Sequence, residues 1–179
     1  MFYTILDDLV LYQLLSFCKK YSNYELQLHS YFFSKTQIDP SYIISIRIDD
    51  TEYIFFFIEK KSYPKARTYL DALRKDFRRK YYQYNQNNKK ITIIKIDNVL
   101  LYLIFNLFPD LHIYDVKIEI NQYLGMYEVL VLLLKDLNLY HIAVGRNGGY
   151  IKAVNVLFKN YIKFDNKNTP VKIKCKAVS

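Results

Sequence analysis

The chain has 179 residues and a formal net charge of +9, and 51% of its residues are hydrophobic while 24% are charged. This composition excludes a disordered chain and provides the core of one large domain or two small ones. The apolar runs are too short to span a bilayer, and the first residues lack a basic secretory or transit signal. We therefore expect a globular protein without a membrane partner.

Residue usage indicates AT-rich codons. Tyr and Phe number 19 and 12, whereas Gly and Pro number 4 each and Trp is absent. This usage is typical of an organelle or of a reduced bacterium, and we expect a mitochondrial protein encoded in the organelle. Cys18 and Cys175 have no metal-ligand spacing, so we expect idle or buried thiols and no metal or cofactor.

Positive charge is concentrated in two stretches. Residues 60–90 contain 11 basic and 2 acidic side chains, and residues 145–179 contain 8 basic and 1 acidic, while the remainder is net negative. Such clusters favour a polyanionic partner. Codon bias can explain lysine but explains arginine poorly. Four of the six arginines lie in the first stretch, at Arg67, Arg74, Arg78 and Arg79.

The first half predicts a helix and a β-hairpin. An apolar, Tyr-rich run indicates a helix as far as about Tyr21. Residues 42–48 and 51–58 have strand character and flank Asp49-Asp50, which suits a tight turn. We expect Phe55-Phe56-Phe57 to pack in the core rather than to stack on bases.

A basic helix is predicted over residues 65–84. Its apolar stripe runs from Tyr69 to Tyr81, and Arg67, Arg74 and Arg78 share another face that Arg79 thickens. We interpret this face as a second RNA contact; a helix lying on a membrane surface is the alternative. A polar linker at 83–90 and a short strand at 91–96 follow. The sequence shows no internal repeat.

The second half predicts helices and strands in a regular order. From residue 97 that order is helix, strand, strand, short helix, glycine turn, helix and strand. The corresponding ranges are 98–108, 113–120, 127–134, the run before residue 145, the turn 145–148, the run from 149 to about 165, and 171–178. Asp97 is the expected N-cap of the first helix.

The turn Gly145-Arg146-Asn147-Gly148 is the feature most suggestive of chemistry. Glycine permits positive φ and a close approach of backbone to ligand, and asparagine tolerates the left-handed conformation. Arg146 adds a forked cationic donor, and a helix that begins near Gly149 would direct its N-terminus at a phosphate. The alternative is that the two glycines merely join two elements.

The helix after the turn has an apolar and a basic side. Ile151, Val154 and Phe158 recur at helical spacing, and Ile162 would extend the stripe. Lysines lie off that stripe on one side: Lys152, Lys159 and Lys163. We therefore expect this helix to bury one face and to present amines to RNA from another.

The order of elements, with the segment Val144-Gly-Arg-Asn-Gly-Gly-Tyr-Ile-Lys-Ala-Val154, resembles the type II KH domain of NusA and of small-subunit ribosomal protein three. The resemblance extends over roughly residues 97–179. It implies an α+β protein with two parts, a KH-like RNA-binding domain at 97–179 and an N-terminal α+β region at 1–95. The RNA contacts implied are Gly145, Arg146, Asn147, Gly148, Gly149 and the nearby lysines.

The resemblance implies a structural component of a mitochondrial small ribosomal subunit, which holds ribosomal RNA in the head near the site of mRNA entry and catalyses no reaction. Expected partners are small-subunit rRNA and neighbouring ribosomal proteins, including a separate polypeptide for the family's C-terminal domain; messenger RNA is a further candidate. Two alternatives stay open: a transcription or RNA-processing factor that resembles NusA, a protein with usually two KH domains and an OB-type domain, and a KH-fold protein scaffold.

Overall fold

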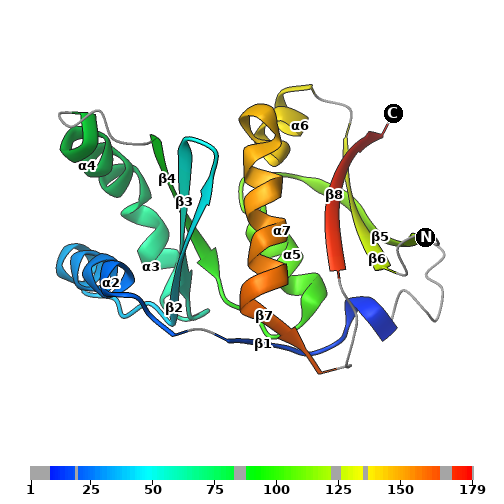
Figure 1. Ribbon diagram of the computed structural model, residues 1–179, viewed down its shortest axis with the longest axis horizontal. Helices are drawn as coiled ribbons and strands as arrows, with labels where there is room; N and C mark the ends of the chain where they lie inside the picture. The colour runs from blue at the N-terminus through cyan, green and yellow to red at the C-terminus, as the bar shows by residue number, and fades with distance from the viewer. Residues whose placement is uncertain are drawn as a thin grey trace. The chain divides into compact units, whose positions relative to one another are not determined.

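The computed structural model describes residues 9–18, 20–82, 88–121, 126–134, 137–165 and 171–178. The chain divides into two compact units. The N-terminal unit is Lys19–Ile96, and the C-terminal unit is Asp97–Ser179 together with the segment that ends at Cys18. Each unit combines helices with one mixed three-stranded sheet (Figure 1), so the α+β class is confirmed.

The N-terminal unit follows the order helix, strand, strand, helix, helix, strand. Its elements are α2 (Asn23–Thr36), β2 (Tyr42–Ile48), β3 (Thr51–Ile58), α3 (Tyr63–Thr68), α4 (Leu70–Tyr82) and β4 (Asn88–Lys95). The sheet order is β2-β3-β4, with β2 antiparallel and β4 parallel to the central strand β3. The predicted hairpin is confirmed, and Asp49 makes its turn at φ 50°.

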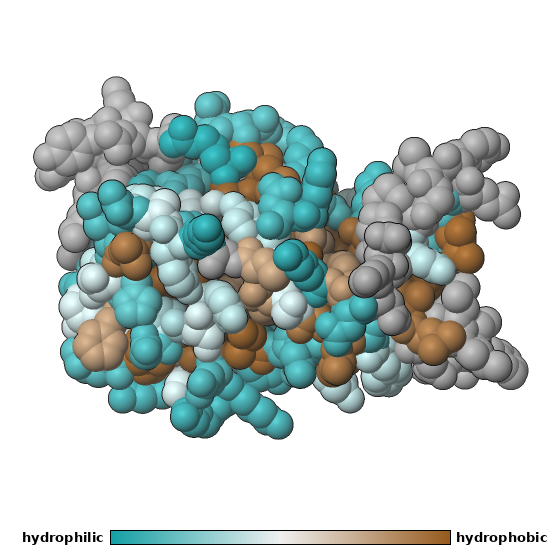
Figure 2. All heavy atoms as spheres, turned by 60° about the horizontal axis from the view of Figure 1, so that its bottom comes forward, coloured by the Kyte–Doolittle hydropathy of each residue, from teal (hydrophilic) through white to brown (hydrophobic). Residues whose placement is uncertain are grey.

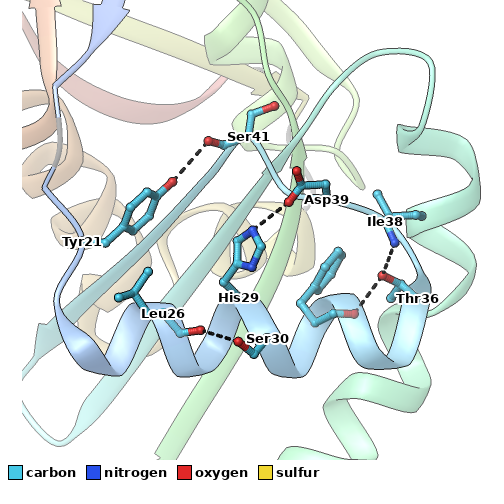
Figure 3. A network of polar contacts seen from close by, with 9 residues as sticks. Tyr21, Leu26, His29, Ser30, Thr36, Ile38, Asp39 and Ser41 are labelled. Carbon is cyan, nitrogen blue, oxygen red and sulfur yellow. Dashed lines mark hydrogen bonds and ion pairs between the residues drawn. The ribbon is translucent and has the colours of Figure 1, made fainter.

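Local hydrogen bonds fix both ends of α2. At its start, Ser22 and Glu25 form a reciprocal capping box, so the helix begins after residue 22. At its end, Gln37 adopts left-handed geometry, and the Thr36 hydroxyl accepts a bond from the Ile38 N–H. Figure 3 shows how His29 of α2, 2.7 Å from Asp39, fastens the helix to the segment that leads into β2.

The core of the N-terminal unit lies between the sheet and its helices. Phe32 of α2 stacks on Phe56 of β3 with ring centroids 4.5 Å apart. Leu73 and Phe77 of α4 belong to the same buried cluster. Every residue of the Phe55-Phe56-Phe57 run is fully buried, as expected for core aromatics. Burying apolar side chains of this size stabilises the unit by ~1.5–3 kcal/mol each.

The predicted helix at 65–84 is interrupted in the structure. Helix α3 ends at Thr68, Tyr69 caps it, and α4 begins at Leu70. Arg67 therefore lies on α3, whereas Arg74 lies on α4. The predicted linker also differs, because residues 88–90 belong to β4 while 83–87 lie outside the described residues.

A buried polar network joins α2 to the sheet. Glu52 of β3 is buried, accepts a 2.5 Å hydrogen bond from Ser45 and forms a 3.2 Å ion pair with Lys89 of β4. Lys89 also donates to the Tyr24 hydroxyl at 2.8 Å. Burial raises the pKa of Tyr24 to about 12, so Tyr24 stays neutral at physiological pH.

The C-terminal unit has the same order of elements. They are α5 (Leu100–Leu107), β5 (Ile113–Asn121), β6 (Met126–Leu134), α6 (Leu137–Val144), the 3₁₀ turn η1 (Arg146–Gly148), α7 (Gly149–Tyr161) and β8 (Val171–Val178). The sheet order is β5-β6-β8, with β5 antiparallel and β8 parallel to β6. The predicted strands and the short helix before the turn are confirmed. Asp97 was expected to be the N-cap of α5, but the N-cap is Val99, and the Asp97 carboxylate accepts a hydrogen bond from the Val99 N–H.

A two-stranded ribbon completes this unit and was not predicted. Strand β1 (Leu15–Phe17) pairs antiparallel with β7 (Ile162–Phe164). Helix α7 therefore ends at Tyr161, not near residue 165, and Lys163 lies on a strand. The segment before residue 19, which was assigned to the first half, belongs to the C-terminal unit. Of the helix expected there, residues 9–11 are helical and residues 1–8 lie outside the described residues, whereas residues 15–17 form strand β1.

The two units repeat one topology, although the sequence shows no repeat. In each, a buried glutamate lies near the start of the central strand: Glu52 is the second residue of β3 and Glu128 the third residue of β6. Each glutamate stands opposite a lysine of the third strand, Lys89 or Lys172. The shared feature is thus the register of three strands, which a comparison of the amino-acid sequences of the two units does not detect.

The described residues expose hydrophilic side chains and also some large hydrophobic ones, among them Leu9, Tyr114 and Ile142. On the face shown in Figure 2, hydrophobic side chains of the described residues lie in small groups among hydrophilic ones. Within the described segments there is no helix with both the length and the hydrophobicity to cross a bilayer. Cys18 and Cys175 are free thiols, and burial raises the pKa of Cys175 to about 12.

Lys174 should stabilise the C-terminal unit through Glu128. Its ammonium hydrogen-bonds this buried carboxylate and holds the pKa of Glu128 below its ordinary value of 4.5. We expect Lys174→Met to lower the free energy of unfolding by ~1–2 kcal/mol at pH 7 in urea titrations. Lys176→Met, on the same strand and exposed, is the control.

The lowered pKa of Glu128 determines how the stability difference should change with pH. A depressed carboxyl pKa stabilises the fold above pH 4.5 and loses that effect as the pH falls through the folded-state pKa. The difference between the native protein and Lys174→Met should therefore shrink in strongly acidic solution. A difference that is independent of pH would contradict this role.

Candidate nucleic-acid interface

The predicted glycine turn joins α6 to α7 in an unusual backbone conformation. Gly145 has φ 74° and ψ 169°, a region that is essentially restricted to glycine. Asn147 (φ 52°) and Gly148 (φ 70°) are left-handed. Three of the four turn residues thus have positive φ, which favours glycine or asparagine at those places.

Gly145 is also required for steric reasons. A Cβ atom at this position would lie 2.8 Å from both the backbone nitrogen and the Cβ of Tyr150. Tyr150 cannot move freely, because its hydroxyl donates to the Leu107 carbonyl and its ring packs edge-on against Phe108. At Gly148, by contrast, a Cβ would meet the Cγ2 of Ile151 at an ordinary contact distance of 4.0 Å. Glycine is therefore needed at position 145 because of close packing, and it is favoured at position 148 because of the positive φ angle.

The turn is closed by its own hydrogen bonds. The Gly145 N–H donates to the His141 carbonyl at 2.9 Å, and the Gly148 N–H donates to the Gly145 carbonyl at 3.0 Å. The Gly149 N–H donates to the carbonyl of Arg146, and Gly149 is buried. These bonds hold the turn rigid, and its outward groups are the exposed side chains of Arg146 and Asn147.

Helix α7 supplies further positive charge beside the turn. It buries Ala153, Val154, Leu157 and Phe158, whereas Ile151 is half-buried. Lys152 and Lys159 are exposed and lie seven residues apart, which places them on one side of the helix, about 10 Å apart along its axis. Lys163 is exposed as well, but on β7.

Asn155 ties α7 to the sheet. Its side-chain amide donates to the Ile173 carbonyl at 2.9 Å and accepts from the Ile173 N–H at 2.8 Å. The same amide donates to the Ile151 carbonyl within the helix. Asn155 thereby pairs with strand β8 as a neighbouring strand would, and fixes the helix that begins at the turn.

The arginines of the N-terminal unit occupy separate environments. Arg78 is exposed, Arg74 is half-buried and lies 3.8 Å from Asp71, and Arg67 is half-buried on α3. The side chain of Arg79 lies outside the described residues. The structure therefore places Arg74 and Arg78 on α4 and Arg67 on α3.

The sequence did not indicate the roles of Asn155 and Tyr150, which hold the turn and its helix in place. A single asparagine on a polar helix side carries no signal of strand pairing. Tyr150 directly follows the glycines, but its contact with α5 depends on long-range packing. Among the described residues, no cluster of three or more His, Cys, Asp or Glu could hold a metal ion.

The two glycines should differ in their tolerance of alanine. We expect Gly145→Ala to lower the free energy of unfolding by about 3 kcal/mol, since φ strain and the clash with Tyr150 add. Gly148→Ala should cost only ~1–2 kcal/mol, and Gly148→Asn less, because only φ is at issue. Urea titrations would measure these values, and equal costs for the two alanine variants would contradict the steric role of Gly145.

Asn155 should contribute measurably to stability. Asn155→Ala leaves the Ile173 N–H and carbonyl without their partner, and we expect a loss of ~1–3 kcal/mol in thermal or urea unfolding. Asn160→Ala, on the exposed side of the same helix, should change stability by less than ~0.5 kcal/mol. Equal effects of the two variants would show that the amide bridge is dispensable.

No protein-family model and no curated protein matches the chain. Among solved structures, the chain is similar to the crystal structure of APE1850, with a TM-score of 0.55 and 18% sequence identity. The similarity covers 87% of this chain and 100% of that chain. At this identity the likeness concerns the fold alone, and it includes parts of both units.

Proposed function

We propose that the C-terminal unit is a type II KH domain and that the protein binds RNA through the turn Gly145–Gly148 without catalysing a reaction. The order α5, β5, β6, α6, turn, α7, β8 supports this assignment, with the short strand β7 between α7 and β8 as an addition to it. The observation that carries it is the turn itself. Its backbone admits no side chain at Gly145, and it directs Arg146 and Asn147 outward at the start of a lysine-bearing helix.

In the proposed mode of binding, a single-stranded segment of RNA lies along the turn with its sugar-phosphate backbone against the glycines. Arg146 contributes a forked, permanently charged donor, which suits phosphate oxygens. Lys152 and Lys159 continue the positive charge along α7, and release of counterions adds to the affinity. The partner is thus recognised by its backbone first and by its bases second.

The repeated topology bears on the kind of RNA-binding protein. Proteins that resemble NusA usually carry two KH domains, and the N-terminal unit has the same order of elements as the C-terminal unit. This supports a transcription or RNA-processing factor. Its expected OB-type barrel is not among the described sheets, which have two or three strands. AT-rich residue usage supports the second candidate, a protein of a mitochondrial small ribosomal subunit.

Reversing the charge of the turn should weaken RNA binding. We expect Arg146→Asp with Asn147→Asp to raise the Kd for a 12-nucleotide single-stranded RNA about tenfold or more, measured by fluorescence anisotropy. The control pair Lys117→Asp with Asn98→Asp makes the same change of net charge at exposed sites of the same unit. Equal Kd values for the two pairs would contradict the role of the turn and favour a protein scaffold.

Cosedimentation separates the two RNA-binding candidates. A ribosomal protein should remain with the small subunit at high salt, because many contacts hold it there. A transcription or processing factor should be released.

A further inference from the structure

The two units differ at the junction before the long helix of their common topology. Four residues, Gly145–Gly148, separate α6 from α7, whereas Tyr69 alone separates α3 from α4. Tyr69 has φ −88° and ψ −8°; its N–H donates to the Ala66 carbonyl, and its own carbonyl accepts from the Leu73 N–H. The N-terminal unit therefore has helical backbone where the C-terminal unit has its glycine turn.

Helix α4 has the same length as α7, 13 residues, and stands at the same place in the order. Residues 60–82, which include α4, contain nine basic and two acidic side chains, a net charge of +7. Arg74, Lys75 and Arg78 lie within about 100° of one another around α4. We call these three residues the cationic face.

The acidic side chains of α4 leave the cationic face positive. Asp76 lies away from it and pairs with Lys35 of α2 at 2.8 Å. Among the described residues, Asp71 forms an ion pair with one member of the cationic face, Arg74, at 3.8 Å. Within the described residues, Lys75 and Arg78 have no ion-pair partner, and both are exposed. Their positive charges are available to an anionic partner.

The packing of α4 argues for RNA over a membrane. A helix on a lipid surface must insert an apolar side among the acyl chains. Among the described side chains of α4, the large apolar ones, Leu70, Leu73 and Phe77, are at most 5% exposed and belong to the core of the unit. Over this described part of α4 the exposed side carries the charges, and a phosphate chain is the partner that matches it by charge.

We propose that the N-terminal unit, which lacks the glycine turn, binds RNA phosphates through the charged side chains of the cationic face of α4. This inference rests on the RNA-binding function proposed above and adds a second contact of different chemistry. Contacts from lysine and arginine to phosphate release counterions, by about 0.7 per contact on a single strand. The N-terminal contact should therefore be strongly dependent on salt.

The test compares the full chain with Lys75→Gln/Arg78→Gln. The control, Lys20→Gln/Arg47→Gln, removes one lysine and one arginine from exposed positions of the same unit. Binding of a 12-nucleotide single-stranded RNA is measured from 50 to 300 mM KCl. We expect the α4 variant to reduce the slope of log K against log salt by about 1.4, and to weaken binding roughly 10- to 30-fold at 0.1 M salt. The control should leave the slope near that of the native protein.

The outcomes separate this inference from the proposed function. If the turn variant weakens binding while the α4 variant matches its control, the cationic face is not an RNA contact and the proposed function stands. If the native protein binds no RNA, both are wrong. If the α4 variant loses binding to vesicles containing phosphatidylserine but keeps its RNA affinity, the partner of α4 is a membrane and the inference is overturned.

Discussion

The candidate interface depends on a steric constraint at one residue. Gly145 brings the chain so close to Tyr150 that a methyl group would lie 2.8 Å from backbone. Tyr150 is in turn held by its bond to Leu107, so the packing of α5 reaches the turn. Asn155, which lies within the helix that follows the turn, fixes α7 to strand β8 of the sheet. The exposed side chains of Arg146 and Asn147 are therefore presented from a rigid support.

The repeated topology gives the chain two frameworks with different chemistry. Both units bury a glutamate near the start of the central strand and place it opposite a lysine. In one unit a glycine turn precedes the long helix, and in the other a single tyrosine does. If both units contact RNA as we propose, the N-terminal unit does so through side-chain charge on α4 and the C-terminal unit through the backbone geometry of the turn.

Local signals allowed much of the fold to be predicted. Strand character around Asp49-Asp50 indicated the hairpin, and the glycines indicated the turn before α7. The break at Tyr69 was missed because the apolar stripe continues through it. Strands β1 and β7 were missed because three residues carry no periodicity and their pairing is long-range. Asn155 was missed because its partner, Ile173, lies on another element.

The ribbon of β1 and β7 has a consequence for biosynthesis. Leu15 emerges early in translation, but its partner Phe164 is made near the end. The intervening N-terminal unit is continuous in sequence and can fold as soon as it leaves the ribosome, whereas the C-terminal unit must wait for its last strands. Closing so long a loop is slow, so the rigid turn is among the last parts of the molecule to acquire its native shape.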